Sequence, residues 1–86
     1  MLQFTERAQV AFEQSTGSAR KQLELKIRAL SKDTTLPNLK IFNSPSGKRL
    51  WVVPVNSNLR LIYSKESNDI VILDILDRVQ YERFKQ

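Results

Sequence analysis

The chain contains no cysteine and no histidine among its 86 residues. Without cysteine it can form neither disulfide bonds nor thiolate metal sites. Without histidine it lacks the most common metal ligand and the usual general base near neutral pH. We therefore expect no metal site and no cofactor, and any acid–base chemistry must use other side chains.

Long apolar segments are also missing. No run approaches the roughly 20 apolar residues that a helix needs to cross a bilayer. The first six residues lack the positively charged and apolar regions of a signal peptide. No repeat, low-complexity tract or linker interrupts the sequence. We therefore expect a cytoplasmic protein without a membrane partner, with residues 1–86 forming a single domain around one modest core.

Acidic residues are the minority among the charged groups. Nine Asp and Glu stand against 14 Lys and Arg, which gives a net charge of +5 and a pI near 9.9. The basic excess is spread over the chain, with seven basic and four acidic residues in 1–43 and seven and five in 44–86. This balance favours a polyanionic partner such as RNA, DNA or an acidic polypeptide.

The first third of the chain has the pattern of two helices. Thr5 is a good N-cap, and the apolar residues after it recur at the spacing of one helix face up to about residue 15. Gly17 should break this helix. A second amphipathic helix is expected over residues 18–32. The short connection favours an antiparallel helical hairpin.

The second half indicates strands. Residues 59–64 nearly alternate between apolar and polar, so Arg60 and Tyr63 should leave opposite faces. Residues 69–76 form an almost continuous, β-branched apolar run, which is typical of a central strand covered on both faces. The polar residues 65–69 between them favour a hairpin.

Two further strands are expected before this hairpin, over residues 39–42 and 50–55. Pro54 cannot donate a ladder hydrogen bond, so it predicts an edge position, a bulge or an early end to pairing. Residues 33–38 should form the loop that leaves the helices, and residues 2–4 could add a short edge strand.

This order of elements predicts the α+β class. An N-terminal helical hairpin should pack on a small, mainly antiparallel sheet of three to four strands, followed by a short C-terminal helix. The helices and the sheet would form two layers.

Four segments of the chain are informative in this order: FTERAQVAFEQ at 4–14, LPNLK at 36–40, SNLRLIYSK at 57–65 and IVILDILDRVQYERF at 70–84. The last two contain a strand with the pattern R-x-x-Y, an apolar strand, and then an Arg followed within a turn by an aromatic residue. Taken together, the four segments resemble the RelE/ParE superfamily, the toxic halves of bacterial toxin–antitoxin pairs. The resemblance covers most of the chain and implies a RelE-like fold with a curved sheet, and a cognate antitoxin as partner.

The resemblance also implies an activity. Ribosome-dependent members are mRNA interferases, metal-independent endoribonucleases that cut messenger RNA in the decoding site and inhibit translation; the superfamily also serves plasmid stabilisation. Arg60 and Arg78 lie at the family's two arginine positions, where guanidinium groups would stabilise the phosphorane. Tyr81 or Phe84 lies at the terminal aromatic position, and of the two only Tyr81 could exchange a proton. We take Arg60, Arg78 and Tyr81 as candidate catalytic residues, and the ribosome and mRNA as expected partners.

The chain departs from the family at two points. The strand lysines used by some members would fall near Trp51 and Val53, and the C-terminal histidine used by others is missing. Other basic and aromatic side chains are candidates for RNA binding, and carboxylates for the missing base. The RNA-binding candidates are Lys40, Lys48, Arg49, Arg83 and Phe84; the carboxylates are Glu66, Asp74 and Asp77.

Two other functions remain open on these residues. A ParE-type inhibitor of DNA gyrase has the same scaffold without the ribonuclease residues, and a catalytically weak RelE-like binding protein would use its basic groups only on the surface. Single residues also have structural alternatives. Arg60 could pair with Asp74 across the sheet, Asp74 could be a structural carboxylate, and Trp51 and Tyr63 could belong to the core.

Overall fold

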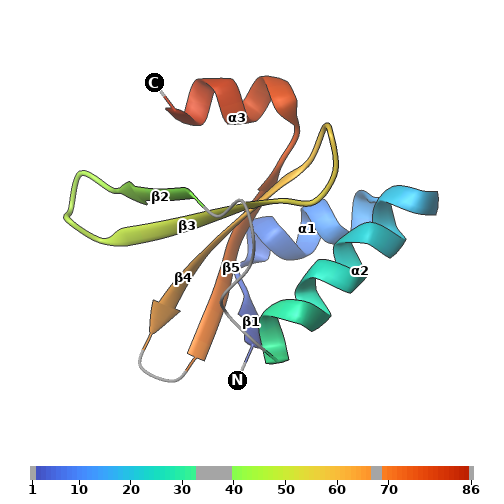
Figure 1. Cartoon of the computed structure of the whole chain (residues 1–86), viewed down its shortest axis with the longest axis horizontal. Helices are drawn as coiled ribbons and strands as arrows, with labels where there is room; N and C mark the ends of the chain where they lie inside the picture. The colour runs from blue at the N-terminus through green and yellow to red at the C-terminus, as the bar shows by residue number, and fades with distance from the viewer. Residues whose placement is uncertain (1, 33–39, 67–68, 86) are drawn as a thin grey trace.

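The computed structural model describes residues 2–32, 40–66 and 69–85 (Figure 1). Three helices and five strands follow one another in this part of the chain. They are β1 (Leu2–Phe4), α1 (Glu6–Gln14), α2 (Gly17–Lys32), β2 (Lys40–Asn43), β3 (Arg49–Pro54), β4 (Arg60–Glu66), β5 (Asp69–Leu76) and α3 (Arg78–Lys85).

The five strands form one sheet in the order β1-β5-β4-β3-β2. Neighbours are antiparallel except β1 and β5, which run parallel with Leu2 opposite Ile70. The α+β class and the mainly antiparallel sheet are confirmed. The sheet has one strand more than the predicted maximum of four, because residues 2–4 do form the edge strand that the sequence left open.

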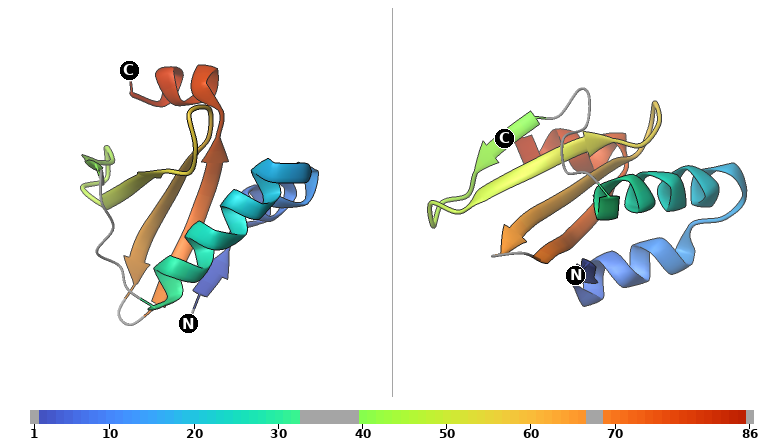
Figure 2. Two further views of the ribbon diagram at one scale, coloured as in Figure 1. Left: turned by 45° about the vertical axis from the view of Figure 1, so that its right-hand side comes forward. Right: turned by 60° about the horizontal axis from the view of Figure 1, so that its bottom comes forward.

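The helical hairpin is confirmed. Helix α1 begins at Glu6 and is capped by Thr5, whose side-chain oxygen accepts a hydrogen bond from the amide of Ala8 at 3.1 Å. Helix α2 begins one residue earlier than predicted, at Gly17, which has a φ of 60° that glycine adopts without strain. Figure 2 shows α1 and α2 lying antiparallel on one face of the sheet, with α3 on the other.

Each face of the sheet carries its own hydrophobic cluster. Strand β4 alternates as predicted, with Leu61 and Tyr63 buried under α1 and α2, and Ile62 buried on the side of α3. On β5, Ile72 belongs to the first cluster and Leu76 to the second. Strand β5 is therefore a central strand covered on both faces, as predicted.

A β-bulge interrupts the pairing of β4 with β5. Ile62 lies opposite Asp74 and Tyr63 lies opposite Ile72, so Leu73 is an extra residue on β5. A bulge shifts the alternation of a strand. Ile72 and Ile75, three residues apart, consequently face the same core.

The remaining boundaries differ slightly from those predicted. Strand β3 ends at Pro54, which agrees with an early end to pairing, so Val55 lies outside it. The predicted loop 33–38, the first residue of the predicted strand 39–42 and part of the predicted turn 65–69 lie outside the described residues. Within the described ranges, no helix is long and apolar enough to cross a membrane.

Candidate functional site

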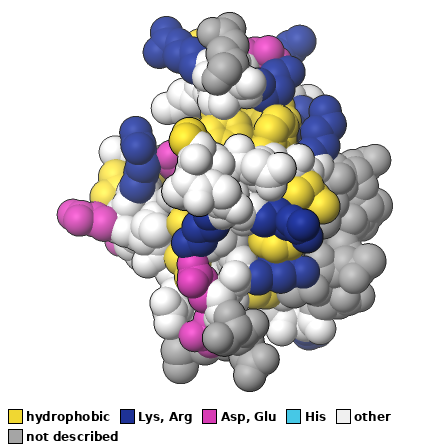
Figure 3. Space-filling model, turned by 90° about the vertical axis from the view of Figure 1, so that its left-hand side faces the viewer, with side chains coloured by type: hydrophobic (Ala, Val, Ile, Leu, Met, Phe, Trp, Pro, Cys, Tyr) yellow, Lys and Arg dark blue, Asp and Glu magenta, His cyan; other side chains and the backbone are white. Residues whose placement is uncertain are grey.

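A pocket of about 580 Å³ lies between α3 and the sheet. We call it the basic pocket, because four of its lining side chains are basic and one is acidic. The lining residues are Lys40, Val52, Pro54, Ser57, Arg60, Arg78, Tyr81, Glu82 and Lys85. Figure 3 views the molecule from the side of the β2–β3 hairpin and shows Lys and Arg side chains distributed around exposed hydrophobic ones.

The strand register brings the three candidate catalytic residues together. Arg60 lies opposite Leu76, the last residue of β5, and Arg78 begins α3 two residues later. Tyr81 follows on the same helix, three residues further and so on the same helix face. All three line the basic pocket, so two arginines and one tyrosine border a single concavity.

The guanidinium of Arg60 is held by backbone carbonyls. Its Nη1 donates hydrogen bonds to the oxygen of Asn56 at 2.7 Å and to the oxygen of Leu59 at 3.0 Å. Its central carbon lies 5.7 Å from the ring centroid of Tyr81. Nε and Nη2 make no hydrogen bond to the described part of the chain. These two nitrogens form the guanidinium edge that binds phosphate in a bidentate manner.

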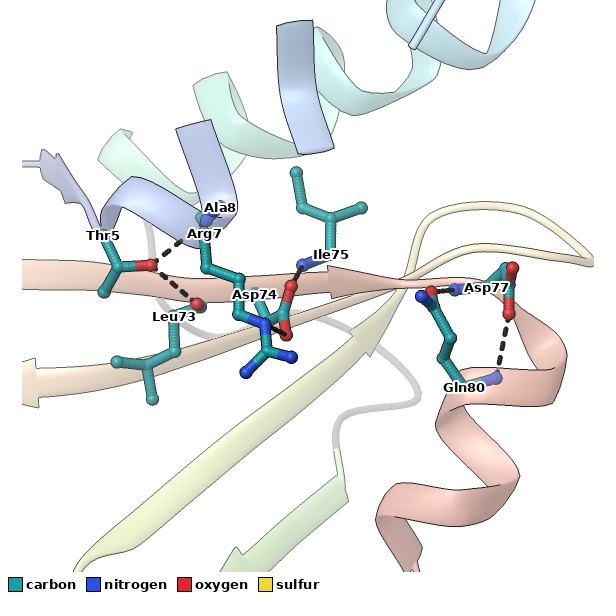
Figure 4. A network of polar contacts seen from close by, with 8 residues as sticks. All are labelled: Thr5, Arg7, Ala8, Leu73, Asp74, Ile75, Asp77 and Gln80. Carbon is teal, nitrogen blue, oxygen red and sulfur yellow. Dashed lines mark hydrogen bonds and ion pairs between the residues drawn. The ribbon is translucent and has the colours of Figure 1, made fainter. Parts of the chain in front are cut away.

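The alternative prediction, that Arg60 forms an ion pair with Asp74 across the sheet, is wrong. Asp74 instead lies 3.3 Å from Nε of Arg7 on α1, and its other oxygen accepts from the amide of Ile75 at 2.9 Å (Figure 4). Asp74 lies opposite Ile62, two positions along β4 from Arg60, and its carboxylate contacts α1 instead. Asp74 is therefore a structural carboxylate that joins α1 to the sheet.

Tyr81 is nearly buried, with 6% of its surface exposed. Its ring packs against Phe84 at 6.3 Å and edge-on against Phe42 at 6.4 Å between centroids. Arg60 and Lys85 both lie over this ring, at 5.7 and 5.3 Å. The hydroxyl makes no hydrogen bond to the described residues. Tyr81 thus anchors α3 and also presents its phenol at the pocket.

The predicted RNA-binding residues fall into three places. Lys40 lines the basic pocket. Lys48 and Arg49 lie at the turn between β2 and β3, away from the pocket lining, and Lys48 forms an ion pair with Glu66. Arg83 and Phe84 line a different cavity of about 990 Å³, on the side of α3 that faces α1 and α2.

Three further polar residues of the pocket were missed by the sequence prediction. They are Ser57, Glu82 and Lys85, and the last two form an ion pair at 3.2 Å. The helical period offered a signal, since residues 78, 81, 82 and 85 share one helix face. The sequence could not show that this face turns toward the sheet.

Glu82 is the one carboxylate among the residues that line the pocket. The three carboxylates considered from the sequence have other contacts. Asp77 caps α3 by exchanging backbone and side-chain hydrogen bonds with Gln80 at 2.8 and 3.0 Å (Figure 4). Glu66 pairs with Lys48, and Asp74 with Arg7.

Trp51 and Tyr63 pack in the core beneath α1 and α2, as the structural alternative predicts. Their rings stack at 5.9 Å between centroids with an interplanar angle of 15°. Burial raises the pKa of the Tyr63 hydroxyl. Neither residue lines the basic pocket.

The basic pocket can bind an anion and stabilise charge on it. Bidentate arginines suit phosphate oxygens, and the low polarity of the surrounding aromatic cluster strengthens such contacts. Within the described ranges, no three Asp or Glu side chains gather in a way that could hold a metal ion. The pocket lining offers arginine, lysine, tyrosine and glutamate side chains for chemistry.

Comparison with known proteins identifies the fold. No family model matches the sequence, and no curated protein is significantly similar to it. Solved structures do match. The archaeal RelE–RelB complex from Pyrococcus horikoshii matches with a TM-score of 0.74 and 13% identity over 90% of this chain and 92% of that one.

Two further solved structures give the same result. The isolated Escherichia coli RelE toxin matches with a TM-score of 0.72 and 20% identity, over 99% of this chain and 95% of that one. The YoeB/ParE toxin from Agrobacterium tumefaciens matches with a TM-score of 0.71 and 14% identity, over 90% and 96%. The resemblance read from the sequence is confirmed at the level of the fold.

Proposed function

We propose that this chain, which has the fold of the RelE and YoeB toxins, is the toxin of a toxin–antitoxin pair and cleaves messenger RNA on the ribosome. The observation that carries the proposal is the basic pocket, in which Arg60, Arg78 and Tyr81 meet. The resemblance to the family supports it, because it puts Arg60 and Arg78 at the family's two arginine positions and Tyr81 or Phe84 at its terminal aromatic position.

The reaction is attack of a ribose 2′-oxygen on the adjacent phosphorus. The 2′-hydroxyl loses its proton, the bond from phosphorus to the 5′-oxygen breaks, and the 5′-oxygen gains a proton. The products are a cyclic 2′,3′-phosphate and a 5′-hydroxyl. Charge builds up on the non-bridging oxygens in the transition state, where preorganised donors lower the barrier most.

Each step has a candidate group in the basic pocket. The guanidinium groups of Arg60 and Arg78 stabilise the phosphorane oxygens. The Glu82 carboxylate accepts the proton of the 2′-hydroxyl, and the Tyr81 hydroxyl donates one to the leaving oxygen. No step requires a metal ion.

The regulatory partner of this toxin would be an antitoxin protein. One structural neighbour is a RelE–RelB complex, and another is described as a RelB–RelE antitoxin–toxin complex. The net charge of +5 favours an acidic partner segment that neutralises the basic pocket. Toxin, antitoxin and ribosome would meet in the cytoplasm.

Inhibition of DNA gyrase is the second candidate function. The observation that favours it is the absence of amines from the strand positions Trp51 and Val53, whose side chains belong to the core. A RelE-like protein without these lysines could act by binding alone. The catalytically weak RelE-like binding protein is a separate, third candidate.

Induced expression in bacteria, followed by primer extension on a translated message, tests the proposal. We expect growth to stop and codon-phased cuts to appear. Arg60→Ala and Arg78→Ala should each lower cleavage by about 10² to 10³-fold, the usual effect of losing one charge-stabilising donor. Arg28→Ala, an exposed position on α2, is the matched control and should leave cleavage unchanged.

Growth arrest with an intact message would contradict ribonuclease function. A supercoiling assay with purified gyrase then separates the alternatives. Inhibition of supercoiling identifies the gyrase inhibitor, and normal growth with neither effect identifies the binding protein.

A further inference from the structure

The turn between β3 and β4, residues 55–59, is closed by its own hydrogen bonds. The Oδ1 atom of Asn56 accepts from the amides of Asn58 at 2.8 Å and Leu59 at 2.7 Å. The amide of Val55 donates to the oxygen of Leu59 at 2.9 Å. An Asn side chain that bonds to the backbone two residues on holds a turn in one conformation. The turn is thus a preorganised piece of backbone.

The same turn orients Arg60. Both hydrogen bonds from Nη1 end on carbonyls of this turn, those of Asn56 and Leu59. A guanidinium is planar, so fixing one nitrogen to two acceptors fixes the direction of the whole group. The conformation of the turn therefore decides where the free edge of Arg60 points.

The turn also holds the start of α3. Oδ1 of Asn58 accepts from the backbone amide of Arg78 at 3.3 Å, across 20 residues of sequence. This amide is one of the four at a helix N-terminus that have no partner within the helix. Asn58 therefore links the position of Arg78 to the turn that orients Arg60.

A third contact ties the turn to the helical layer. Nδ2 of Asn56 donates to Oε1 of Gln22 on α2 at 2.7 Å. The turn is consequently braced from both sides of the sheet, by α2 through Asn56 and by α3 through Asn58. Supporting contacts of this kind keep a functional side chain within a narrow range of positions and orientations.

We propose that Asn56 and Asn58 are positioning residues that set the separation and orientation of Arg60 and Arg78 for one phosphodiester group. They act through the turn and do not themselves line the basic pocket. The inference rests on the proposed function for its choice of RNA as the ligand.

Binding of a short single-stranded 2′-O-methyl RNA tests the inference without cleavage, since this RNA has no free 2′-hydroxyl. NMR signals of the arginine Nε–H groups report the orientation of Arg60 and Arg78 directly. Asn58→Ala removes the acceptor for the Arg78 amide, whereas Asn58→Asp keeps it. Asn56→Ala is the second variant, and Asn43→Ala, at an exposed strand end, is the control.

We expect Asn58→Ala and Asn56→Ala to shift the Arg60 and Arg78 signals and to weaken RNA binding about tenfold, the scale of one lost hydrogen bond. Asn58→Asp should restore the wild-type arginine signals. Asn43→Ala should change neither. Thermal unfolding of each variant confirms that the comparison is made between folded proteins.

Wild-type arginine signals and affinity in both Ala variants would overturn the inference. So would a failure of Asn58→Asp to restore the signals that Asn58→Ala shifts. Failure of the proposed function looks different. A wild-type protein that binds the RNA through both arginines but cuts no message would refute the ribonuclease and leave the positioning role intact.

Discussion

At the scale of the residue, Tyr81 combines two properties that substitution can separate. Its ring fills the contact between α3 and the sheet, next to Phe42 and Phe84. Its hydroxyl is the proton donor of the proposed reaction. Removing the hydroxyl alone tests the chemistry, and removing the ring tests the packing.

We predict that Tyr81→Phe leaves the free energy of unfolding nearly unchanged and lowers RNA cleavage about 10²-fold, the lower range for losing a general acid. Tyr81→Ala should also lower the free energy of unfolding by about 3 kcal/mol, because a buried aromatic ring is lost. Urea denaturation and primer extension measure the two effects. Full cleavage by Tyr81→Phe would exclude the hydroxyl as proton donor.

Tyr63 gives a prediction about pH. Burial raises the pKa of its hydroxyl above the usual 10.0, so the folded state favours the neutral phenol. Its contribution to stability is complete below pH 10, where the phenol of the unfolded chain ionises, and is lost as the pH rises through the raised folded pKa. Because one proton is involved, the slope due to Tyr63 cannot exceed about 1.4 kcal/mol per pH unit in that window.

Denaturation of the wild type and Tyr63→Phe across this range isolates the effect, because lysine ionisation is common to both proteins. The wild type should lose stability more steeply than Tyr63→Phe. Parallel curves would show that Tyr63 does not take part.

Side-chain direction was predictable where a simple period applied. Alternation along β4 placed Arg60 on the face opposite Tyr63, and the structure has it there. The partners of Arg60 were not predictable, because they are backbone carbonyls whose position depends on the conformation of residues 55–59. Glu82 was missed for a related reason, since a helical period does not reveal which face is turned inward.

At the scale of the element, the junction of β1 and α1 depends on one side chain. Thr5 accepts from the amide of Ala8 and donates from Oγ1 to the oxygen of Leu73 on β5 at 2.7 Å. The first bond caps the helix, and the second ties the cap to the bulged strand (Figure 4).

We therefore predict that Thr5→Ala lowers the free energy of unfolding by about 1 to 2 kcal/mol, the upper part of the range for a lost N-cap. Thr5→Ser keeps the hydroxyl and should retain most of the stability. Chemical denaturation measures both variants. Equal losses in the two would show that the methyl group, and not the hydrogen bonds, matters at this position.

Most elements were predictable because their signals are local. The helical hairpin follows from apolar spacing and a glycine, and the β4–β5 hairpin from two apolar runs around a polar turn. Two features depend on distant parts of the chain. The partner of β1 lies 68 residues away, and the bulge at Leu73 appears only when β4 and β5 are aligned.

At the scale of the whole molecule, the net charge follows directly from the amino-acid composition. The net charge of +5 is partly gathered in the basic pocket, where four basic side chains outweigh one carboxylate. Binding of a polyanion to such a site releases counterions, so it weakens as salt is added.

We predict that the affinity for a single-stranded RNA falls with a slope of about −2 in a plot of log K against log salt, which corresponds to roughly three phosphate contacts. Fluorescence anisotropy at several KCl concentrations measures the slope. Lys40→Ala should make it shallower, and the exposed α2 variant Lys21→Ala should not. A slope near zero would show that the pocket does not bind the RNA backbone.

The parallel pairing of β1 with β5 has a consequence for how the chain acquires its structure. The β4–β5 hairpin joins neighbouring residues and can form early, whereas closing a loop between Leu2 and Ile70 costs more entropy and comes late. We expect the surface around Arg60 and Arg78 to form first, and α1 and α2 to pack onto the sheet last. Until these helices pack, the apolar face of the sheet that they cover is exposed to solvent, so aggregation competes with completion of folding.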